Sequence, residues 1–457
     1  MQNSPQIRAK YAESFRCIGS ACEDTCCQGW GVPIDLATYE KYQSLPPSPL
    51  RTLIDASVVR SLDGGENQAP ANPKVFAKIQ MDASNQCPLL TCEGLCRIQA
   101  ELGEALLSHT CATYPRIVHA ANGLHETALT LSCPEAARLV LLTPDLLAPS
   151  GPCGGQLHQD QTAEPAQNED PRPSLSPNFW QIRESVLWLV KNRAYPIWQR
   201  MFLLGVFCQR LDSIAKGELK RSVPEFLQNF KTTVATNSLR TAMETVPFER
   251  MAQLDVVLRL AGLMLHRSNV RPRFVECIQA FTTGIGNGPG ATLDSLSKRY
   301  SLAYDRYYEP FFHRHPHILE NYLINTIVRC QFPFGRDGIN ASEQPQTGKE
   351  LHGREFASLT VQFALIKGLL IGVAGFHREA FSAAHVVHTV QAASKHFEHH
   401  PEFLNLAHGL LVESQMDGAR GLGILLRNAR PKPAPERNYP ATPGIEAFEL
   451  HSQMPTA

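Results

Sequence analysis

The sequence has no excess of charge of either sign and no long uncharged apolar run. In its 457 residues, 43 Lys and Arg balance 43 Asp and Glu. Zero net charge argues against a nucleic-acid coat or a polybasic membrane binder. The most apolar stretch, 364–376, falls short of 18 residues and contains Lys367 and three glycines. We therefore expect no nucleic-acid partner, no membrane partner and no membrane-spanning helix.

The first ten residues lack the apolar core of a signal peptide, which favours a cytoplasmic location. Cysteine is scarce overall, with 13 residues, far below the content of a small disulfide scaffold. Its distribution is uneven, because ten of the 13 lie in the first 153 residues. Since cytosolic thiols are kept reduced, clustered cysteines there indicate a metal or redox site rather than disulfides.

Beyond the cysteines, apolar residues recur at helical spacing and alternating runs are few. The predicted helices cover 179–191, 197–214, 224–234, 250–266, 292–311, 317–329, 355–370, 379–397 and 402–412. The expected fold is mainly α, with an irregular Cys-rich N-terminal segment packed on a multi-helix body. The predicted organisation is a metal-cluster segment (1–148), a Pro-rich linker or loop (149–178), a helical region forming one functional unit with the first (179–427) and a disordered tail (428–457).

A Rossmann-type sheet is not expected. The glycine-rich stretch 284–290 follows a segment, 274–281, that has the spacing of an amphipathic helix rather than a strand. Pro289 also interrupts the turn that would have to lead into a phosphate-binding helix. We therefore expect 284–290 to be a loop.

The cysteines form two groups with further single residues: Cys17, Cys22, Cys26 and Cys27; Cys87, Cys92 and Cys96; then Cys111 and Cys133. Thiolates are soft ligands that suit zinc or iron–sulfur clusters. Structural zinc sites prefer two close pairs, commonly C-x2-C, and neither group has one. This favours an iron–sulfur cluster, with a zinc site or simple buried thiols as the alternatives.

Several longer motifs stand out along the chain. In the N-terminal part they are Tyr11-Ala-Glu-Ser-Phe-Arg-Cys17, Cys22-Glu-Asp-Thr-Cys26-Cys27-Gln-Gly-Trp30, Cys87-Pro-Leu-Leu, Gly94-Leu-Cys96-Arg, Thr110-Cys111-Ala-Thr-Tyr114-Pro-Arg116 and Leu131-Ser-Cys133-Pro-Glu135. Later motifs are His315-Pro-His-Ile-Leu-Glu320-Asn321-Tyr322-Leu-Ile-Asn325, Phe332-Pro-Phe-Gly335 and Ala364-Leu-Ile-Lys-Gly368. Together they resemble the bacterial flagellin lysine-N-methylase family, and the resemblance covers most of residues 11–412. Cys92 is outside the family pattern.

The resemblance implies transfer of methyl groups from S-adenosylmethionine to lysines of flagellin, with a [4Fe-4S] cluster. The implied metal ligands are drawn from Cys22, Cys26, Cys27, Cys87, Cys96, Cys111 and Cys133, and Cys17 joins them by spacing and context. This set exceeds the four sites of one cubane, so either a subset ligates or there are two centres. Cys26 is followed directly by Cys27, which departs from the C-x3-C-x2-C of radical enzymes.

Further candidates come from the other matched motifs. Tyr114, Glu320 and Tyr322 are the predicted catalytic residues, with Glu320 or Tyr322 accepting the lysine proton. The predicted cofactor-binding residues are Arg116, which suits a carboxylate, Asn321 and Asn325. The alternative for 320–322 is that these polar groups satisfy hydrogen bonds of buried helix packing. The alternative function is a zinc- or iron-chelating binding module without methyltransferase activity, and a redox carrier is a third class.

Overall fold

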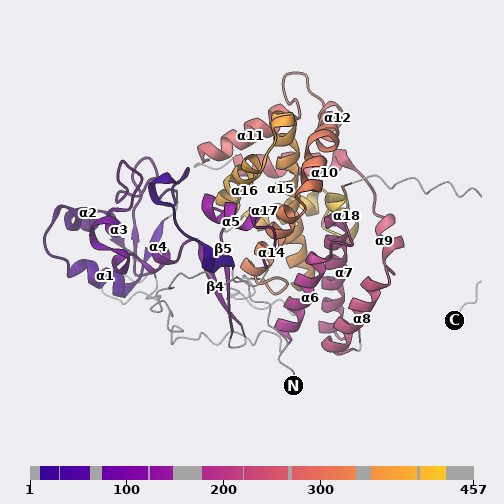
Figure 1. The fold of residues 1–457 in the computed structure, drawn as a ribbon, viewed down its shortest axis with the longest axis horizontal. Helices are drawn as coiled ribbons and strands as arrows, with labels where there is room; N and C mark the ends of the chain where they lie inside the picture. Colours follow the sequence, from indigo (N-terminus) through magenta and orange to yellow (C-terminus); the bar gives the residue numbers. More distant parts are fainter. Residues whose placement is uncertain are drawn as a thin grey trace, which may run out of the picture.

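A computed structural model describes residues 11–29, 31–61, 75–121, 124–147, 178–219, 221–265, 270–335, 351–398 and 402–428. The predicted linker and tail lie outside the described residues except for Asn178 and Asn428. Figure 1 shows a small lobe built by the first part of the chain beside a larger helical body.

The small lobe holds four short helices and a three-stranded sheet. The helices are α1 (Leu36–Gln43), α2 (Pro49–Ser57), α3 (Arg97–Leu102) and α4 (His109–Thr113), and the strands are β1 (Val32–Ile34), β2 (Val58–Arg60) and β3 (Ala77–Ile79). The central strand β3 pairs antiparallel with both neighbours. A separate apolar core, including Ile34, Tyr42 and Ile54, stabilises this lobe.

An antiparallel hairpin and one helix join the lobe to the body. The hairpin strands are β4 (Arg116–Ala121) and β5 (Leu124–Leu129), and the helix is α5 (Pro134–Leu142). Leu129, Leu131 and Val140 belong to the core of the helical body, as do Tyr11 and Phe15 from the N-terminal segment. The Cys-rich segment therefore packs on the helices through its two ends.

The described regular elements of the body are all helices. They are α6 (Phe179–Lys191), α7 (Ile197–Ala215), α8 (Val223–Ala235), α9 (Arg240–Glu244), α10 (Arg250–Leu265), α11 (Pro272–Gly284), α12 (Leu293–Ala303), α13 (Glu309–Arg314), α14 (His317–Arg329), α15 (Leu351–His377), α16 (Ala383–Phe397), α17 (Phe403–Glu413) and α18 (Ala419–Leu426). A π-helical turn, Tyr304–Tyr308, joins α12 to α13. The predicted mainly α fold is confirmed, and the described strands form only two small antiparallel sheets.

Helix α15 occupies the centre of the body (Figure 1). It is long and apolar enough to cross a membrane by length and composition, but 89% of its most apolar stretch is buried inside the fold. Gly284 of α11 lies so close to the backbone of α15 that an added Cβ would collide with the carbonyl oxygen of Gly372. The residues 285–290 form turns after α11, as expected of a loop.

Candidate metal centre

The first cysteine group lies on an irregular loop at the edge of the small lobe. The Cys22 thiol donates a hydrogen bond to the carbonyl oxygen of Asp24 at 2.9 Å, and the Sγ atoms of Cys26 and Cys27 are 3.9 Å apart. Gly29 ends the loop with a φ of +82°, a conformation that favours glycine.

Backbone pairing brings the second cysteine group to the first. The amide of Cys87 donates to the carbonyl oxygen of Cys27 at 2.8 Å, and Gln28 pairs with Gln86 as an isolated β-bridge. Cys87 is part of the lobe's core, and Cys27, Cys96 and Cys111 pack against it. Four of the predicted ligand residues therefore lie in or against this core, and Cys26 adjoins one of them, Cys27.

Cys26 is the common neighbour in this arrangement. Its thiol interacts electrostatically with Cys27, Cys87, Cys96 and Cys111, and also with Cys133 at the start of α5. A hydrogen bond from Cys27 lowers the pKa of Cys26, and likewise that of Cys87, to about 7. Burial raises the pKa of Cys111 and of Cys133 to about 12.

The remaining cysteines are less central. Cys22 interacts electrostatically with Cys17 and Cys133. Cys17 and Cys92 are exposed, and Cys208 and Cys277 are buried in the helical body. Within the described ranges no three or more His, Cys, Asp or Glu side chains are arranged as ligands of a single metal ion. Five of the other seven predicted ligands thus interact with Cys26, whereas Cys22 and Cys17 are linked to the set through Cys133 and Cys22, and the described residues form no compact tetrahedral site.

Basic and polar residues of the helical body hold the loop that carries Cys22 to Cys27. Lys395 of α16 donates to the Asp24 carboxylate at 2.7 Å and to the Thr25 carbonyl oxygen at 2.6 Å. Gln391 donates to the same carboxylate at 2.8 Å, and Arg271 donates to the carbonyl oxygen of Gln28 at 2.5 Å. Sequence reasoning missed these residues because no local pattern connects positions more than 200 residues apart.

Tyr114 lies next to the cysteines, where the small lobe meets the body. It interacts electrostatically with Cys133, Cys26 and Asp24, and burial raises its pKa well above the ordinary value. Its hydroxyl is 3.0 Å from the Ser132 hydroxyl. Arg116 donates to the carbonyl oxygen of Phe15 at 3.0 Å and covers the ring of the same residue. The structure thus places Tyr114 beside the predicted ligands Cys26 and Cys133, and gives Arg116 a contact with the N-terminal segment.

The predicted residues on α14 make packing contacts. Both carboxylate oxygens of Glu320, which is 2% exposed, accept hydrogen bonds from Arg193 and Arg200. Asn321 donates to the carbonyl oxygens of Val140 and Thr143 at the end of α5.

Asn325 and Tyr322 lie further along the same helix. Asn325 donates to the carbonyl oxygen of Leu129 at 2.8 Å and accepts from the Tyr11 hydroxyl at 2.7 Å. Tyr322 is buried and interacts electrostatically with Glu398 and Arg329. None of the contacts described for these α14 residues joins them to a predicted cysteine ligand, and their catalytic or cofactor-binding roles stay predictions.

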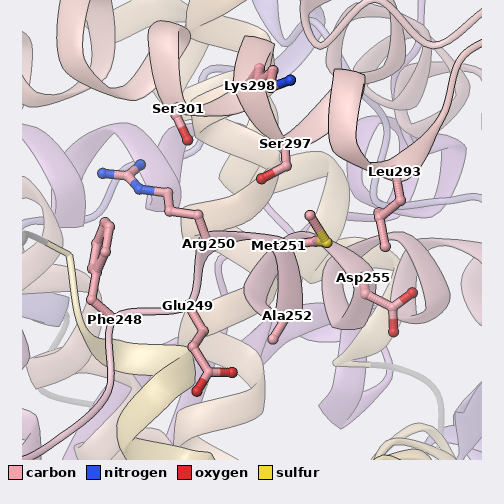
Figure 2. A pocket seen from close by; sticks show the side chains of 10 residues that line it. All are labelled: Phe248, Glu249, Arg250, Met251, Ala252, Asp255, Leu293, Ser297, Lys298 and Ser301. Carbon is pink, nitrogen blue, oxygen red and sulfur yellow. The ribbon is translucent and has the colours of Figure 1, made fainter.

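A cavity of about 810 Å³ opens between α10 and α12, away from these residues. Figure 2 shows Met251, Asp255 and Ser297 among the side chains that line it. Arg250, at one side of this cavity, packs its guanidinium over the ring of Tyr304 at 3.7 Å. Its lining includes none of the predicted site residues.

Comparison with known proteins identifies relatives of this chain. A family model described as the FliB lysine N-methylase C-terminal domain matches residues 183–425, more than half of the chain. The flagellar biosynthetic protein FliU of Salmonella muenchen is 33% identical over 142 residues, which are 30% of this chain and 78% of that protein.

The lysine-N-methylases of Salmonella typhimurium and Salmonella choleraesuis are also 33% identical over 142 residues, which are 30% of this chain but 33% of each enzyme. The matched region thus spans a third of the length of these two relatives. No solved structure matches the chain. The family model covering the helical body and the match to most of FliU show that this chain belongs to the FliB lysine N-methylase family.

Proposed function

We propose that the protein is a cytoplasmic lysine N-methyltransferase that transfers methyl groups from S-adenosylmethionine to flagellin and carries a [4Fe-4S] cluster. The observation that carries the proposal is the gathering of cysteine thiols around Cys26, where the small lobe meets the family-defining helical body. Membership in a lysine N-methylase family supports the reaction, and the relative named as a flagellar biosynthetic protein supports the substrate.

The donor set suits an iron–sulfur cluster, because thiolates are soft ligands and several segments of the chain contribute them. Zinc is the alternative: Zn–S bonds of 2.3 Å place the sulfurs of a tetrahedral site about 3.8 Å apart, and Cys26 and Cys27 have that spacing. A cubane separates its ligand sulfurs more widely, which suits thiols contributed by several segments. The residues that would hold it are Cys26, Cys27, Cys87, Cys96 and Cys111, or a subset of these with Cys22 and Cys133.

When bound, such a cluster supplies a Lewis-acidic iron that can hold the amino and carboxylate groups of a methyl donor. The protein's own task is to produce an unprotonated lysine nitrogen, because an ammonium, with an ordinary pKa near 10.4, has no lone pair. Burial of that ammonium against the lobe lowers its pKa. Glu320 is poorly placed to accept the proton, since both its oxygens already accept from arginines.

Co-expression with flagellin followed by intact-mass measurement tests the function. The wild-type protein should raise the mass of flagellin in steps of about 14 Da, because each methylation replaces a hydrogen atom with a methyl group. Cys26→Ser should abolish them, whereas Cys208→Ser, which changes a buried thiol of α7, should not. Metal-loaded protein that adds no increments would contradict methyl transfer and support a chelating module instead.

A further inference from the structure

A chain of hydrogen-bonded hydroxyl groups leads from Tyr114 into the protein. The Tyr114 hydroxyl is 3.0 Å from that of Ser132, which is 2.9 Å from that of Thr130. Thr130 in turn donates a hydrogen bond to the carboxylate of Glu398. Three segments far apart in the sequence contribute to the chain: the end of α4, the connection between β5 and α5, and the residue after α16.

The carboxylate at one end fixes the direction of every bond in the chain. An ionised carboxylate only accepts, so the single hydroxyl hydrogen of Thr130 points to Glu398. Ser132 must then donate to Thr130, and Tyr114 must donate to Ser132. Each O–H bond therefore points from Tyr114 toward Glu398, which is the order needed to pass a proton in that direction.

Glu398 carries a buried carboxylate and is not among the predicted metal ligands. Its side chain is 3% exposed and lies 3.4 Å from the Nε atom of Arg329 on α14. Tyr322 of the same helix also interacts electrostatically with Glu398. Arg329 donates a further hydrogen bond to the side-chain oxygen of Gln362 at 3.3 Å. Arg329 thus keeps a hydrogen-bond partner if Glu398 becomes neutral.

The opposite end of the chain lies beside predicted metal ligands. Tyr114 packs against the core of the body, which includes Cys133, and it interacts electrostatically with Cys133 and Cys26. Glu398 has its partners in Thr130 and α14. The chain therefore joins the candidate metal centre, where the proposed function places methyl transfer, to a buried carboxylate.

We propose that Tyr114, Ser132 and Thr130 form a relay that carries the proton of the substrate lysine ammonium to Glu398. This inference rests on the proposed function. An N–H bond of the ammonium breaks and its proton moves to the Tyr114 oxygen, while Tyr114, Ser132 and Thr130 each pass their own proton onward. Glu398 becomes a carboxylic acid, and the electron pair left on the lysine nitrogen is free to form the N–CH3 bond. Tyr114 contacts the substrate, and Glu398 acts through the hydroxyls as a positioning residue.

Thr130→Val and Thr130→Ser form a matched pair for testing the relay. Valine keeps the shape of threonine but removes the hydroxyl, whereas serine retains it. Holoenzyme of each variant, matched for iron content and melting temperature, is assayed in single turnovers with flagellin and S-adenosylmethionine. We expect Thr130→Val to slow methyl transfer by about 10²-fold, to reduce the solvent deuterium isotope effect, and to make the rate rise with pH as bulk hydroxide replaces the relay. Thr130→Ser should retain the wild-type rate and pH profile.

Glu398→Gln provides the second variant. An amide accepts no proton at neutral pH, so it should reproduce the altered pH profile of Thr130→Val, while the infrared carboxylate band assigned to Glu398 disappears. Equal rates, isotope effects and pH profiles for Thr130→Val and Thr130→Ser, in the presence of wild-type methyl transfer, would overturn the relay alone. Absence of methyl transfer by the wild-type holoenzyme would overturn the proposed function and the relay with it.

Discussion

The carboxylate of Glu320 is predicted to stabilise the helical body, so we expect Glu320→Ala to unfold far more easily than the wild-type protein. Glu320 joins α14 to the start of α7 through Arg200 at 2.7 Å, and to Arg193 at 2.9 Å. Arg193 is 51% exposed at its side chain, so water replaces its lost partner at little cost. Arg200 is only 6% exposed and would remain buried without its counter-ion.

The expected loss of unfolding free energy follows from the different environments of Arg193 and Arg200. Breaking a buried ion pair by removing one partner costs about 3–5 kcal/mol. Arg200 still donates to the carbonyl oxygens of Val190 and Tyr195, at 2.6 and 2.8 Å, so the cost should lie at the low end. We expect the free energy of unfolding to fall by about 3 kcal/mol.

Urea unfolding followed by circular dichroism measures this change from the shift of the midpoint and the slope. The matched control is Glu244→Ala, which removes the exposed partner of Arg240 on α9 and should cost about 0.3–0.5 kcal/mol. An unchanged midpoint for Glu320→Ala would refute the reasoning. A stable Glu320→Gln variant that loses methyl transfer would instead restore the catalytic role predicted from the sequence.

Three further predictions concern other parts of the fold. Burial lowers the pKa of Lys367 to about 7 from the ordinary 10.5, so the unfolded chain binds more protons than the folded protein between these pH values. The stability of the wild-type protein relative to Lys367→Met should therefore rise from pH 7 toward 10.5. Parallel stability curves of the two proteins against pH would contradict this prediction. Gly284→Ala should destabilise the protein by about 1–3 kcal/mol, because the added methyl group collides with α15. Its control, Gly409→Ala, has open space around it and should stabilise the protein by about 0.5–1 kcal/mol. Equal unfolding midpoints of the two variants would contradict the close approach of α11 to α15. Lys395→Met removes the hydrogen bonds from Lys395 to Asp24 and Thr25. Limited proteolysis should then cut the loop around these two residues faster than in the wild-type protein, and an unchanged cleavage rate would contradict the prediction.

Much of the helical body could be predicted from the sequence because several of its helices are long and have apolar residues at helical spacing. Helices α6 and α14 occupy the predicted ranges 179–191 and 317–329. The range 292–311 was predicted as one helix, but a π-helical turn divides it into α12 and α13. The strands β1, β2 and β3 have three residues each, too few for an alternating pattern to be recognised.

The candidate site was predictable where chemistry is carried by residue type. Cysteine spacing and family motifs predicted Cys26, the five cysteines that interact with it, and Tyr114; the ligand and catalytic roles of these residues stay predictions. The contacts that organise the site were not predictable, because Lys395 meets Asp24, and Glu398 meets Thr130, across more than 260 residues of sequence. For Glu320 the packing alternative agrees with the observed contacts, since a buried carboxylate must find partners in any fold.

The most direct test of the central claim is the iron and acid-labile sulfide content of anaerobically purified protein. The wild-type protein and Cys208→Ser should contain equal amounts of both, in the one-to-one ratio of a [4Fe-4S] cluster. Cys26→Ser and Cys87→Ser should lose most of both, because these thiols lie at the centre of the cysteine arrangement. Stoichiometric zinc without sulfide in the wild type, or full iron and sulfide in Cys26→Ser, would contradict the account.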